Sequence, residues 1–289
     1  MRTAEWKDYS VISTGNGYKL ERWGEVTLLR PDPQVIWPMS WDLFSYPKLN
    51  AYYKRSEKGG GGWKIVKPFP DEWNIDYEKL DVRFKIKPMG FKHTGLFPEQ
   101  AVNWEYATEL IRSAGRPIKV LNLFAYTGGA TVACAKAGAQ VTHVDAAKGM
   151  VERAGENARL SGIETGIRYI VDDCIKFVQR EIRRGNKYDA IIMDPPSYGR
   201  GPSGETWKIE NDLYKFVELC AKVLCDQPLF VLINSYTTGL QPMVLKNILE
   251  LTLKEFKGKV DAYEVGIQTE EGIALPCGAG GIFVYDAND

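Results

Sequence analysis

Four apolar runs of this chain each end in residues that could do chemistry. The first run ends in the turn at residues 124–128 (Phe-Ala-Tyr-Thr-Gly), the second in Asp145, the third in Asp172-Asp173 and the fourth in Asp194-Pro195-Pro196-Ser197. Carboxylates accept hydrogen bonds from sugar hydroxyls and amino groups. Ligands of open α/β sheets bind just beyond the carboxyl ends of the strands. If the four runs are neighbouring parallel strands, their polar ends form a single site that suits a nucleoside.

The glycine turn and the first acids match the geometry of an adenosine site. Gly128 lets the backbone approach a ligand closely, and the helix expected after it adds a partial positive charge. Asp145 follows Gly128 by seventeen residues, near the roughly 20-residue spacing at which a carboxylate accepts ribose hydroxyls. Asp173 stands where a carboxylate could accept the adenine amino group. Taken singly, Gly128 could be an ordinary turn and either acid a helix cap.

The aromatic residues of the turn distinguish between cofactors. Nicotinamide dinucleotides favour G-x-G-x-x-G, whose glycines make room for a pyrophosphate, whereas Phe124 and Tyr126 occupy the turn here. These bulky rings argue against a diphosphate. They fit S-adenosylmethionine, whose sulfonium cation is attracted to aromatic faces by ~0.5–2 kcal/mol. The turn therefore predicts a nucleoside cofactor without phosphate.

Asp194-Pro-Pro-Ser is the candidate catalytic motif. Neither Pro195 nor Pro196 can donate a hydrogen bond, and Pro196 also keeps Pro195 out of the helical region. We expect a stiff turn that leaves carbonyl oxygens unpaired toward a cleft. Such a turn suits a planar base, with Asp194 orienting its amino or ring-nitrogen edge. For Asp-Pro-Pro alone, a strand followed by an ordinary proline turn is an equal alternative.

The elements that must position these residues alternate from residue 93 onward. Alternating strands and helices predict parallel strands joined by right-handed crossovers. The expected strands are 118–124, 140–145, 167–171, 188–193, 229–234, 259–266 and 281–285. The expected helices are 129–137, 148–160, 174–184, 210–224 and 242–256. The last two strands lack a helix between them, which predicts an antiparallel hairpin on a mostly parallel seven-stranded sheet.

Residues 1–92 differ in composition from the rest of the chain and contain many aromatic residues and prolines. Short strands are expected at 18–23, 26–30, 62–66 and 82–87, with turn signals between them. The sequence therefore predicts a Rossmann-like α/β domain at residues 93–289 and a small β-rich domain at residues 1–92.

Composition narrows the class of protein. The chain has 289 residues, 44% hydrophobic and 26% charged, with a formal net charge of zero, which is typical of a soluble globular protein. We find neither a secretion signal nor a run of about 18 apolar residues. Five scattered cysteines form no Cys-x-x-Cys pair. We therefore expect a cytoplasmic protein with no membrane contact, disulfide framework or metal site; the oligomeric state is not indicated.

A basic and aromatic segment of the small β-rich domain suggests a nucleic-acid partner. Basic and aromatic residues interleave around the glycine run 59–62: Lys48, Tyr52, Tyr53, Lys54, Arg55, Lys58, Trp63, Lys64 and Lys67. Cations for phosphates beside aromatics for base stacking are typical of single-stranded nucleic-acid surfaces. Acidic residues lie among them, so a solvated surface of mixed charge fits the segment equally well.

The motifs resemble a known family. The segment 120–129 (Val-Leu-Asn-Leu-Phe-Ala-Tyr-Thr-Gly-Gly), the strand-end acids and Asp194-Pro-Pro-Ser197 are similar to class I S-adenosylmethionine-dependent methyltransferases. The bacterial large-subunit ribosomal RNA methyltransferases for cytosine carbon-5 and guanine N7 resemble it best. The segment 93–100 (His-Thr-Gly-Leu-Phe-Pro-Glu-Gln) is similar to their Thr-Gly-aromatic-aromatic-x-Asp-Gln segment. Over the first ninety residues the resemblance is looser and lacks the extra RNA-binding domain of some members.

The resemblance implies roles for individual residues. The residues that would hold the cofactor are Phe124, Tyr126, Thr127 and Gly128 under the methionine part, Asp145 at the ribose and Asp173 at the adenine amino group, with Gln100 closing over the cofactor. The residues that would line the target base are Asp194, Pro195, Pro196 and Ser197. Generic members have an acid where this chain has Asn122, whereas the RNA-modifying group often has Asn there.

One departure from the group bears on mechanism. Its cytosine carbon-5 members have a nucleophilic Cys after the fifth strand, where this chain has Asn234-Ser235-Tyr236. Carbon-5 needs a covalent thiolate adduct. A nitrogen or hydroxyl instead attacks directly if its lone pair is aimed within about 3–3.5 Å of the methyl carbon. We interpret Cys220 and Cys225 as packing residues, with Cys277 as the one outside candidate nucleophile.

The sequence therefore predicts an enzyme, an S-adenosylmethionine-dependent methyltransferase that acts on RNA, ribosomal RNA above all, by direct in-line transfer. A small molecule or a protein is the alternative substrate. The alternatives from other classes are an NAD-dependent oxidoreductase and a catalytically silent RNA-binding protein. Phe124 and Tyr126 argue against the first, and the intact Asp145, Asp173 and Asp194 against the second.

Overall fold

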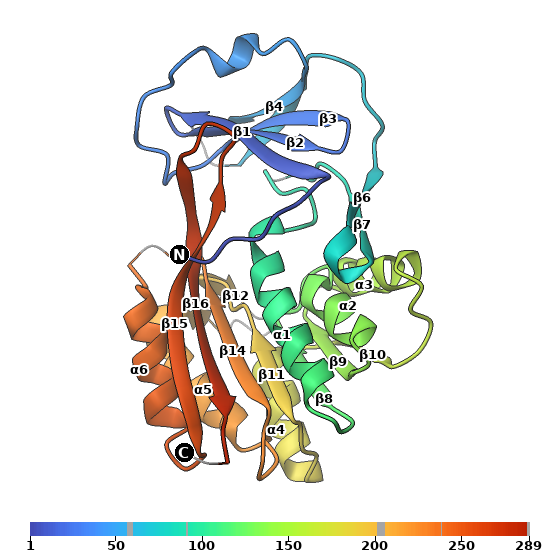
Figure 1. Ribbon diagram of the computed structural model, residues 1–289, viewed down its shortest axis with the longest axis vertical. Helices are drawn as coiled ribbons and strands as arrows, with labels where there is room; N and C mark the ends of the chain where they lie inside the picture. The colour runs from blue at the N-terminus through green and yellow to red at the C-terminus, as the bar shows by residue number, and fades with distance from the viewer. Residues whose placement is uncertain (57–59, 91, 201–205, 238, 288–289) are drawn as a thin grey trace. The chain divides into compact units, whose positions relative to one another are not determined.

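A computed structural model describes residues 1–56, 60–90, 92–200, 206–237 and 239–287 (Figure 1). By its internal contacts the chain divides into two compact units. The larger consists of Met1–Arg2, Gln100–Val265 and the residues from Cys277 onward, and the smaller of Thr3–Glu99 and Gly266–Pro276. The division at residue 99 falls a few positions after the boundary expected at 92. A segment near the C-terminus also belongs to the smaller unit.

The larger unit is built on a seven-stranded sheet in the order β10-β9-β8-β11-β14-β16-β15. Its strands are β8 Lys119–Leu123, β9 Gln140–Asp145, β10 Ile167–Val171, β11 Ala190–Met193, β14 Phe230–Ser235, β15 Gly258–Gln268 and β16 Ala274–Tyr285. The strands from β10 to β14 pair in parallel, whereas β16 is antiparallel to β14. This confirms the predicted mostly parallel sheet with an antiparallel end.

Helices cover both faces of this sheet (Figure 1). They are α1 Ala101–Ser113, α2 Gly129–Lys136, α3 Lys148–Leu160, α4 Cys174–Arg184, α5 Ile209–Ala221 and α6 Pro242–Thr252. Apolar residues of α4, α5 and α6 pack on one face against Met193 and Ile233. Apolar residues of α1 and α2 pack on the other face against Ile192 and Leu232. Successive strand residues thus alternate between two buried faces, as expected for a covered parallel sheet.

Two features of this unit were not expected from the sequence. Helix α1 was missed because its buried side includes Asn103 and Thr108, which interrupt the apolar stripe that predicts a helix. Strands β12 Tyr198–Arg200 and β13 Thr206–Lys208 form an antiparallel hairpin between the expected strand 188–193 and the expected helix 210–224, where no strand was predicted. The residues between these two strands lie outside the described part of the chain.

The smaller unit contains a five-stranded sheet in the order β1-β2-β3-β4-β5 and a separate pair, β6 with β7. Its elements are β1 Tyr9–Gly15, β2 Tyr18–Trp23, β3 Val26–Pro31, η1 Leu43–Ser45, β4 Leu49–Arg55, β5 Gly61–Ile65, β6 Trp73–Tyr77, η2 Glu78–Leu80 and β7 Val82–Ile86. The turn between β1 and β2 is Asn16-Gly17, with φ of 49° and 78°, the pair typical of tight hairpins. Strands β2, β3, β5 and β7 were predicted within one residue at each end; β1, β4 and β6 were missed.

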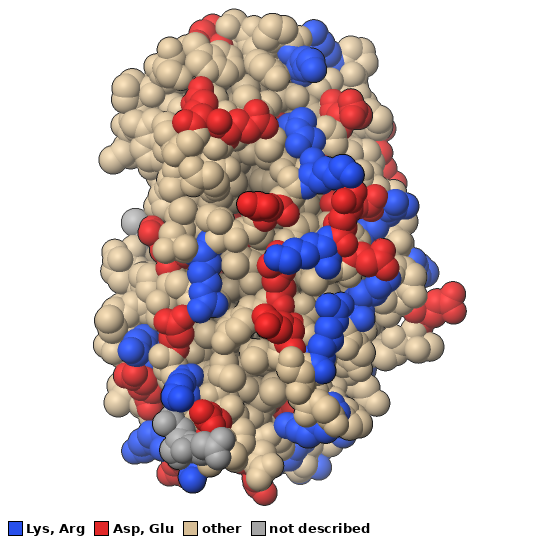
Figure 2. All heavy atoms as spheres, viewed as in Figure 1, with Lys and Arg blue, Asp and Glu red and all other residues tan. Residues whose placement is uncertain are grey.

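The described ranges include no helix long and apolar enough to cross a membrane. On the face shown in Figure 2, Lys and Arg side chains are interspersed with Asp and Glu. This mixture is in keeping with a formal net charge of zero.

Candidate active site

The carboxyl ends of the parallel strands bring the predicted residues to one edge of the sheet. Leu123 of β8 pairs with Met193 of β11 on one side and with Val144 of β9 on the other. The next residues along these strands therefore lie side by side: Phe124, Asp145 and Asp194. Because β8 and β11 are neighbours in the sheet but not in the sequence, the strand order reverses between them. Such a reversal opens a crevice for ligands at the carboxyl ends.

The turn after β8 has an unusual backbone. Phe124 and Tyr126 have φ of 54° and 51°, a conformation rare for bulky residues. At Phe124 it accompanies packing of the ring against Trp207 and Phe216, with ring centroids 5.6 Å and 5.5 Å away. The ring contacts stabilise a strained turn, as is common where a backbone is shaped for function.

Two glycines are required here by packing. A Cβ on Gly128 would lie 2.8 Å from the Cβ of Ala154 on α3, and a Cβ on Gly129 would lie 2.5 Å from the Trp104 ring on α1. Both distances are shorter than Cβ contacts normally reach. The turn backbone therefore lies directly against α3 and α1, which fixes the start of α2 beside the strand ends.

Asp145 is held by two backbone N–H groups. Its Oδ2 accepts from the N–H of Tyr126 and its Oδ1 from the N–H of Ala147, each at 2.8 Å. The side chain is half-buried. Each carboxylate oxygen has a second lone pair, so the oriented group retains the capacity to accept a pair of hydroxyls at the strand end.

Asp173 is the N-cap of α4. Its Oδ1 accepts from the N–H of Lys176 at 2.9 Å, and its own N–H donates to Oδ1 of Asp172 at 2.9 Å. Asp172 in turn forms an ion pair with Arg180. The interpretation of Asp173 as a helix cap is therefore correct. Capping occupies one oxygen, and a contact to adenine through the other stays a prediction.

The Asp-Pro-Pro-Ser turn differs from the expectation in one respect. The indole N–H of Trp207 donates to the carbonyl of Pro196 at 2.6 Å. The expectation that both proline carbonyls are unpaired is therefore wrong for Pro196, because the β12–β13 hairpin returns Trp207 to the turn. The Ser197 hydroxyl lies 2.6 Å from that of Thr237. Asp194 is half-buried at the start of the turn, and its contact with a target stays a prediction.

Gln100 lies at the end of a short 3-10 helix, η3 Pro98–Gln100, and is buried. Its Oε1 accepts from Asn103 Nδ2 at 2.8 Å, and its Nε2 donates to the Tyr236 hydroxyl at 2.5 Å. Asn103 also donates to Oδ1 of Asn234 at 2.8 Å. The family motif indicated Gln100. Sequence reasoning missed the other three, because a lone polar residue inside a helix or at a strand end gives no local signal.

The similarity of this chain to known proteins identifies its family. Residues 45–250 match the family model for S-adenosylmethionine-dependent methyltransferases. The chain belongs to this family. The solved structure of the SAM-dependent methyltransferase from Agrobacterium tumefaciens is similar over 98% of this chain and 92% of its own, with 33% identity and a TM-score of 0.91. SMU.776 complexed with S-adenosylhomocysteine shares the fold, with 19% identity and a TM-score of 0.75 over 97% of this chain and 76% of its own.

Curated relatives of the methyltransferase are matched over part of their length. The ribosomal RNA large subunit methyltransferase K/L of Shewanella frigidimarina is 33% identical over 171 residues, 57% of this chain and 22% of that protein. The ribosomal RNA large subunit methyltransferase I of Aeromonas hydrophila is 33% identical over 131 residues, 45% of this chain and 32% of that protein. The chain thus spans less than a third of the length of either.

S-adenosylmethionine is the cofactor of this methyltransferase, and the strand ends offer groups that fit it. The oriented carboxylate of Asp145 suits a ribose diol. Glycine at position 128 lets the turn backbone pack directly against α3 beside the end of β8. Membership of the family also excludes the nicotinamide alternative, in agreement with the aromatic turn.

The surroundings of Cys134, Cys174 and Cys220 disfavour their thiolate forms. Cys134, Cys174, Cys220 and Cys277 are buried, and Cys225 is partly buried. Burial raises the pKa of Cys134 to about 12 and raises the pKa values of Cys174 and Cys220 well above their ordinary range. A cysteine nucleophile needs its thiolate form, so these surroundings favour a packing role.

In the smaller unit, the basic and aromatic segment contributes the β4–β5 hairpin. The Tyr53 hydroxyl donates to the carbonyl of Gly90 at 3.3 Å, and the Trp63 indole donates to the carbonyl of Met89 at 2.8 Å. These two rings therefore support the fold. The cations exposed to solvent are Lys48, Lys54, Arg55, Lys64 and Lys67. Lys58 lies outside the described residues.

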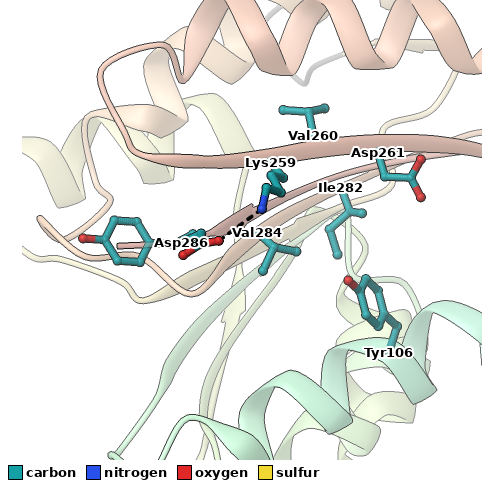
Figure 3. A pocket seen from close by; sticks show the side chains of 8 residues that line it. Tyr106, Lys259, Val260, Asp261, Ile282, Val284 and Asp286 are labelled. Carbon is teal, nitrogen blue, oxygen red and sulfur yellow. Dashed lines mark hydrogen bonds and ion pairs between the residues drawn. The ribbon is translucent and has the colours of Figure 1, made fainter. Parts of the chain in front are cut away.

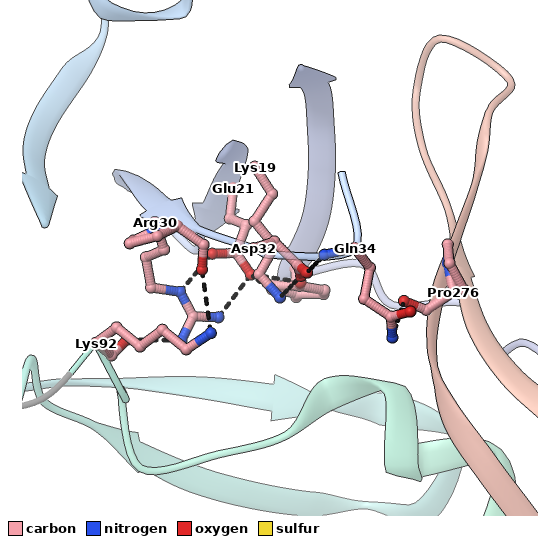
Figure 4. A network of polar contacts seen from close by, with 9 residues as sticks. Lys19, Glu21, Arg30, Asp32, Gln34, Lys92 and Pro276 are labelled. Atoms are coloured by element: carbon pink, nitrogen blue, oxygen red, sulfur yellow. Dashed lines mark hydrogen bonds and ion pairs between the residues drawn. The ribbon is translucent and has the colours of Figure 1, made fainter. Parts of the chain in front are cut away.

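A buried charge network lies in the same unit (Figure 4). Arg30 donates to both carboxylate oxygens of Glu21, at 2.5 Å and 2.7 Å. Burial by itself would raise the pKa of Glu21, but the charges of Arg30 and Lys19 outweigh it and the pKa is lowered. Lys92 donates to the carbonyl of Pro31 at 3.1 Å, and burial, reinforced by the charge of Lys19, lowers its pKa to about 8. Each of these buried charged groups thus has a polar partner within the unit.

A pocket in the larger unit lies away from the candidate site (Figure 3). It is lined by Tyr106 of α1 and by residues of β15 and β16 with their flanks, and Lys259 and Asp286 form an ion pair of 3.3 Å within it. Val284 in its lining pairs with Phe230 at the start of β14. The pocket is therefore at the amino end of the parallel strands, where ligands of this fold do not normally bind.

Proposed function

We propose that this methyltransferase transfers the methyl group of S-adenosylmethionine to a base of RNA, with ribosomal RNA as the favoured substrate. One observation carries the proposal: Asp145 and Asp194 occupy strand ends on the two sides of the turn after β8. The first suits a cofactor ribose and the second suits the amino or ring-nitrogen edge of a target. The substrate class comes from the relatives, which are named ribosomal RNA large subunit methyltransferases.

Individual roles follow the strand order. Residues proposed for the cofactor are Gln100, Phe124, Tyr126, Thr127, Gly128, Asp145 and Asp173. Residues proposed for the target are Asp194, Pro195, Pro196 and Ser197. The carbonyl of Pro196, which accepts from the Trp207 indole, would hold the turn in shape and would not itself bind the base.

The cofactor supplies a methyl group bound to a positively charged sulfur. The protein's part in the reaction is then to aim a lone pair of the target at that carbon and to take up the proton that the target loses. Asp194 is proposed to orient an N–H of the target and to accept its hydrogen bond or proton. This mechanism needs no covalent adduct, in agreement with the buried cysteines.

The exposed cations of the β4–β5 hairpin are proposed to contact RNA phosphates. A ribosomal RNA substrate also implies a cytoplasmic protein. Methylation of a small molecule or a protein is the alternative within the same family.

The direct test uses purified protein, S-adenosylmethionine with a tritiated methyl group, and total RNA from a strain that lacks the gene. We expect label in RNA, and one new methylated nucleoside after digestion. Asp194→Asn should abolish incorporation while leaving S-adenosylhomocysteine affinity, measured by calorimetry, at the parental value. Label in a metabolite or protein fraction, with none in RNA, would refute the RNA assignment.

The RNA platform has a separate test. For single strands the logarithm of affinity falls with the logarithm of salt by about 0.7 per phosphate contact. Changing Lys54, Arg55 and Lys64 to Ala should therefore flatten this slope by up to about 2. A control variant loses the same charge from exposed lysines of the larger unit, Lys215, Lys254 and Lys257. If both triple variants change the slope equally, the hairpin is not the platform.

A further inference from the structure

A fully buried amide on α1 organises the polar side chains behind the site. Asn103 is 1% exposed. Its Nδ2 donates to Gln100 and to Asn234, each at 2.8 Å, and its Oδ1 accepts from the Tyr263 hydroxyl at 2.6 Å. Both amide protons and the carbonyl oxygen are thereby used. Because the hydroxyl of Tyr263 donates, it determines which end of the Asn103 amide faces Gln100 and Asn234.

Tyr263 is itself held in place. The guanidinium of Arg2 lies over its ring at 3.7 Å and forms an ion pair with Asp261 at 2.6 Å. Burial is the largest of the influences that raise the pKa of Tyr263 to about 12, so the hydroxyl keeps its proton at neutral pH. Tyr263 on β15 therefore fixes the orientation of Asn103 on α1.

Because the Asn103 amide is fixed, the Nδ2 of Asn234 remains as a hydrogen-bond donor. The Oδ1 of Asn234 accepts a hydrogen bond from Asn103, so the oxygen end of the Asn234 amide is already used. Within the described residues, the Nδ2 of Asn234 donates to no protein atom. Asn234 is 4% exposed, but its Nδ2 is not among the buried side-chain nitrogens that lack a partner in the described residues, so this N–H reaches solvent at the strand end. An oriented donor of this kind points to a ligand that supplies the acceptor.

The position of Asn234 identifies the ligand. Ile233 of β14 pairs with Met193 of β11, so Asn234 and Asp194 follow at adjacent carboxyl ends, about 4.8 Å apart across the sheet. Met193 and Ile233 both face the helices α4 to α6, and Asn234, the next residue of β14, faces α1, where it accepts from Asn103. Asp194 directly follows the last residue of β11. A donor and an acceptor thus lie at adjacent strand ends.

We propose that Asn234, oriented by Asn103 and Tyr263, donates a hydrogen bond to the target base beside Asp194, and so selects an edge in which an N–H group adjoins a carbonyl oxygen or ring nitrogen. This inference rests on the proposed function. Asp194 accepts from the N–H, and Asn234 donates to the neighbouring lone pair. Nucleobases present this pairing on their Watson–Crick edge, which enzymes read once the base is out of the stack. Asn234 is then a specificity residue, and Asn103 and Tyr263 are positioning residues.

The test uses the full chain, tritiated S-adenosylmethionine and RNA from the strain lacking the gene. Asn234→Asp keeps the oxygen that accepts from Asn103 but replaces the outward donor by an acceptor. We expect kcat/KM for RNA to fall about 10- to 100-fold, with S-adenosylhomocysteine affinity and melting temperature close to parental values. Asn234→Ser, which removes the donor without adding charge, serves if the aspartate variant does not fold.

The positioning role has its own readout. Tyr263→Phe should lower kcat/KM for RNA by about threefold to tenfold. The double variant with Asn234→Asp should be no worse than Asn234→Asp alone, since both act through one donor. Tyr106→Phe is the control: its ring lies 5.1 Å from the same Arg2 guanidinium but outside the amide chain, and it should remain at parental activity.

Two results would overturn the inference while the proposed function stands. One is parental RNA turnover in Asn234→Asp and Asn234→Ser. The other is a loss of S-adenosylhomocysteine affinity equal to the loss of RNA turnover, which would assign the donor to the cofactor. Failure of the parental protein to label any RNA would instead refute the proposed function, and this inference with it.

Discussion

Gly128→Ala tests whether the cofactor turn depends on close packing. Two terms contribute to its cost. The φ of 84° at this residue penalises any side chain by about 1–2 kcal/mol. The added Cβ would also lie 2.8 Å from the Ala154 Cβ, and relieving an overpacked contact costs about 1–3 kcal/mol. We therefore expect the free energy of unfolding to fall by about 2–5 kcal/mol, and the affinity for S-adenosylhomocysteine to fall as the turn moves.

Two further variants separate these terms. Gly162 has a similar φ of 75° with no atom within 4 Å of an added Cβ, so Gly162→Ala should show the conformational term alone. Ala154→Gly in the Gly128→Ala background removes the methyl that the new Cβ meets, and should recover most of the packing term. Urea unfolding measures all four proteins, and calorimetry measures cofactor affinity. If Gly128→Ala costs no more than Gly162→Ala, the packing argument is refuted.

Three other predictions address the cofactor, the cysteines and acid stability. Asp145→Ala should weaken S-adenosylmethionine and S-adenosylhomocysteine binding by about 1.5–3 kcal/mol in calorimetry; unchanged affinity would mean that the ribose is held elsewhere. Cys277→Ser should retain RNA methylation, whereas loss of turnover with intact cofactor binding would restore a covalent mechanism. Burial lowers the pKa of His143 from 6.5 to about 4, so its neutral form contributes stability that is complete above pH 6.5 and is lost as the pH falls toward 4, by up to about 1.4 kcal/mol per pH unit. His143→Gln should have a shallower dependence of unfolding free energy on pH in that window; an identical slope would show that His143 does not titrate on unfolding.

The strands and helices of the larger unit were predictable because their ends are set locally. Expected bounds at 140–145, 148–160, 167–171 and 174–184 agree with β9, α3, β10 and α4 to the residue. Asp173 and Gly185 mark the two ends of α4 by cap chemistry alone. The order of these elements was sufficient to place four polar segments at one sheet edge.

The features that sequence reasoning missed depend on distant partners. Trp207 reaches the carbonyl of Pro196 only through the hairpin β12–β13. Asn103 gains its role from side chains on β14 and β15, and a buried amide looks like an interruption of an apolar stripe. Positive φ at Phe124 has no signature in the sequence, since that conformation is usually associated with glycine or asparagine.

The segment Gly266–Pro276 has a consequence for how the protein is made. It belongs to the smaller unit, where Glu271 accepts from Ser13 at 2.8 Å and from the Trp41 indole at 3.0 Å, and the N–H of Glu270 donates to the carbonyl of Val11 at 2.9 Å. A ribosome adding ~5–20 residues per second needs roughly ten to thirty seconds to pass from residue 99 to this segment. During that interval the smaller unit lacks these partners, while all the parallel strands of the larger unit are synthesised. The smaller unit, most of which is synthesised first, is thus among the last to be completed, and a fragment cut after residue 99 would never acquire the missing contacts.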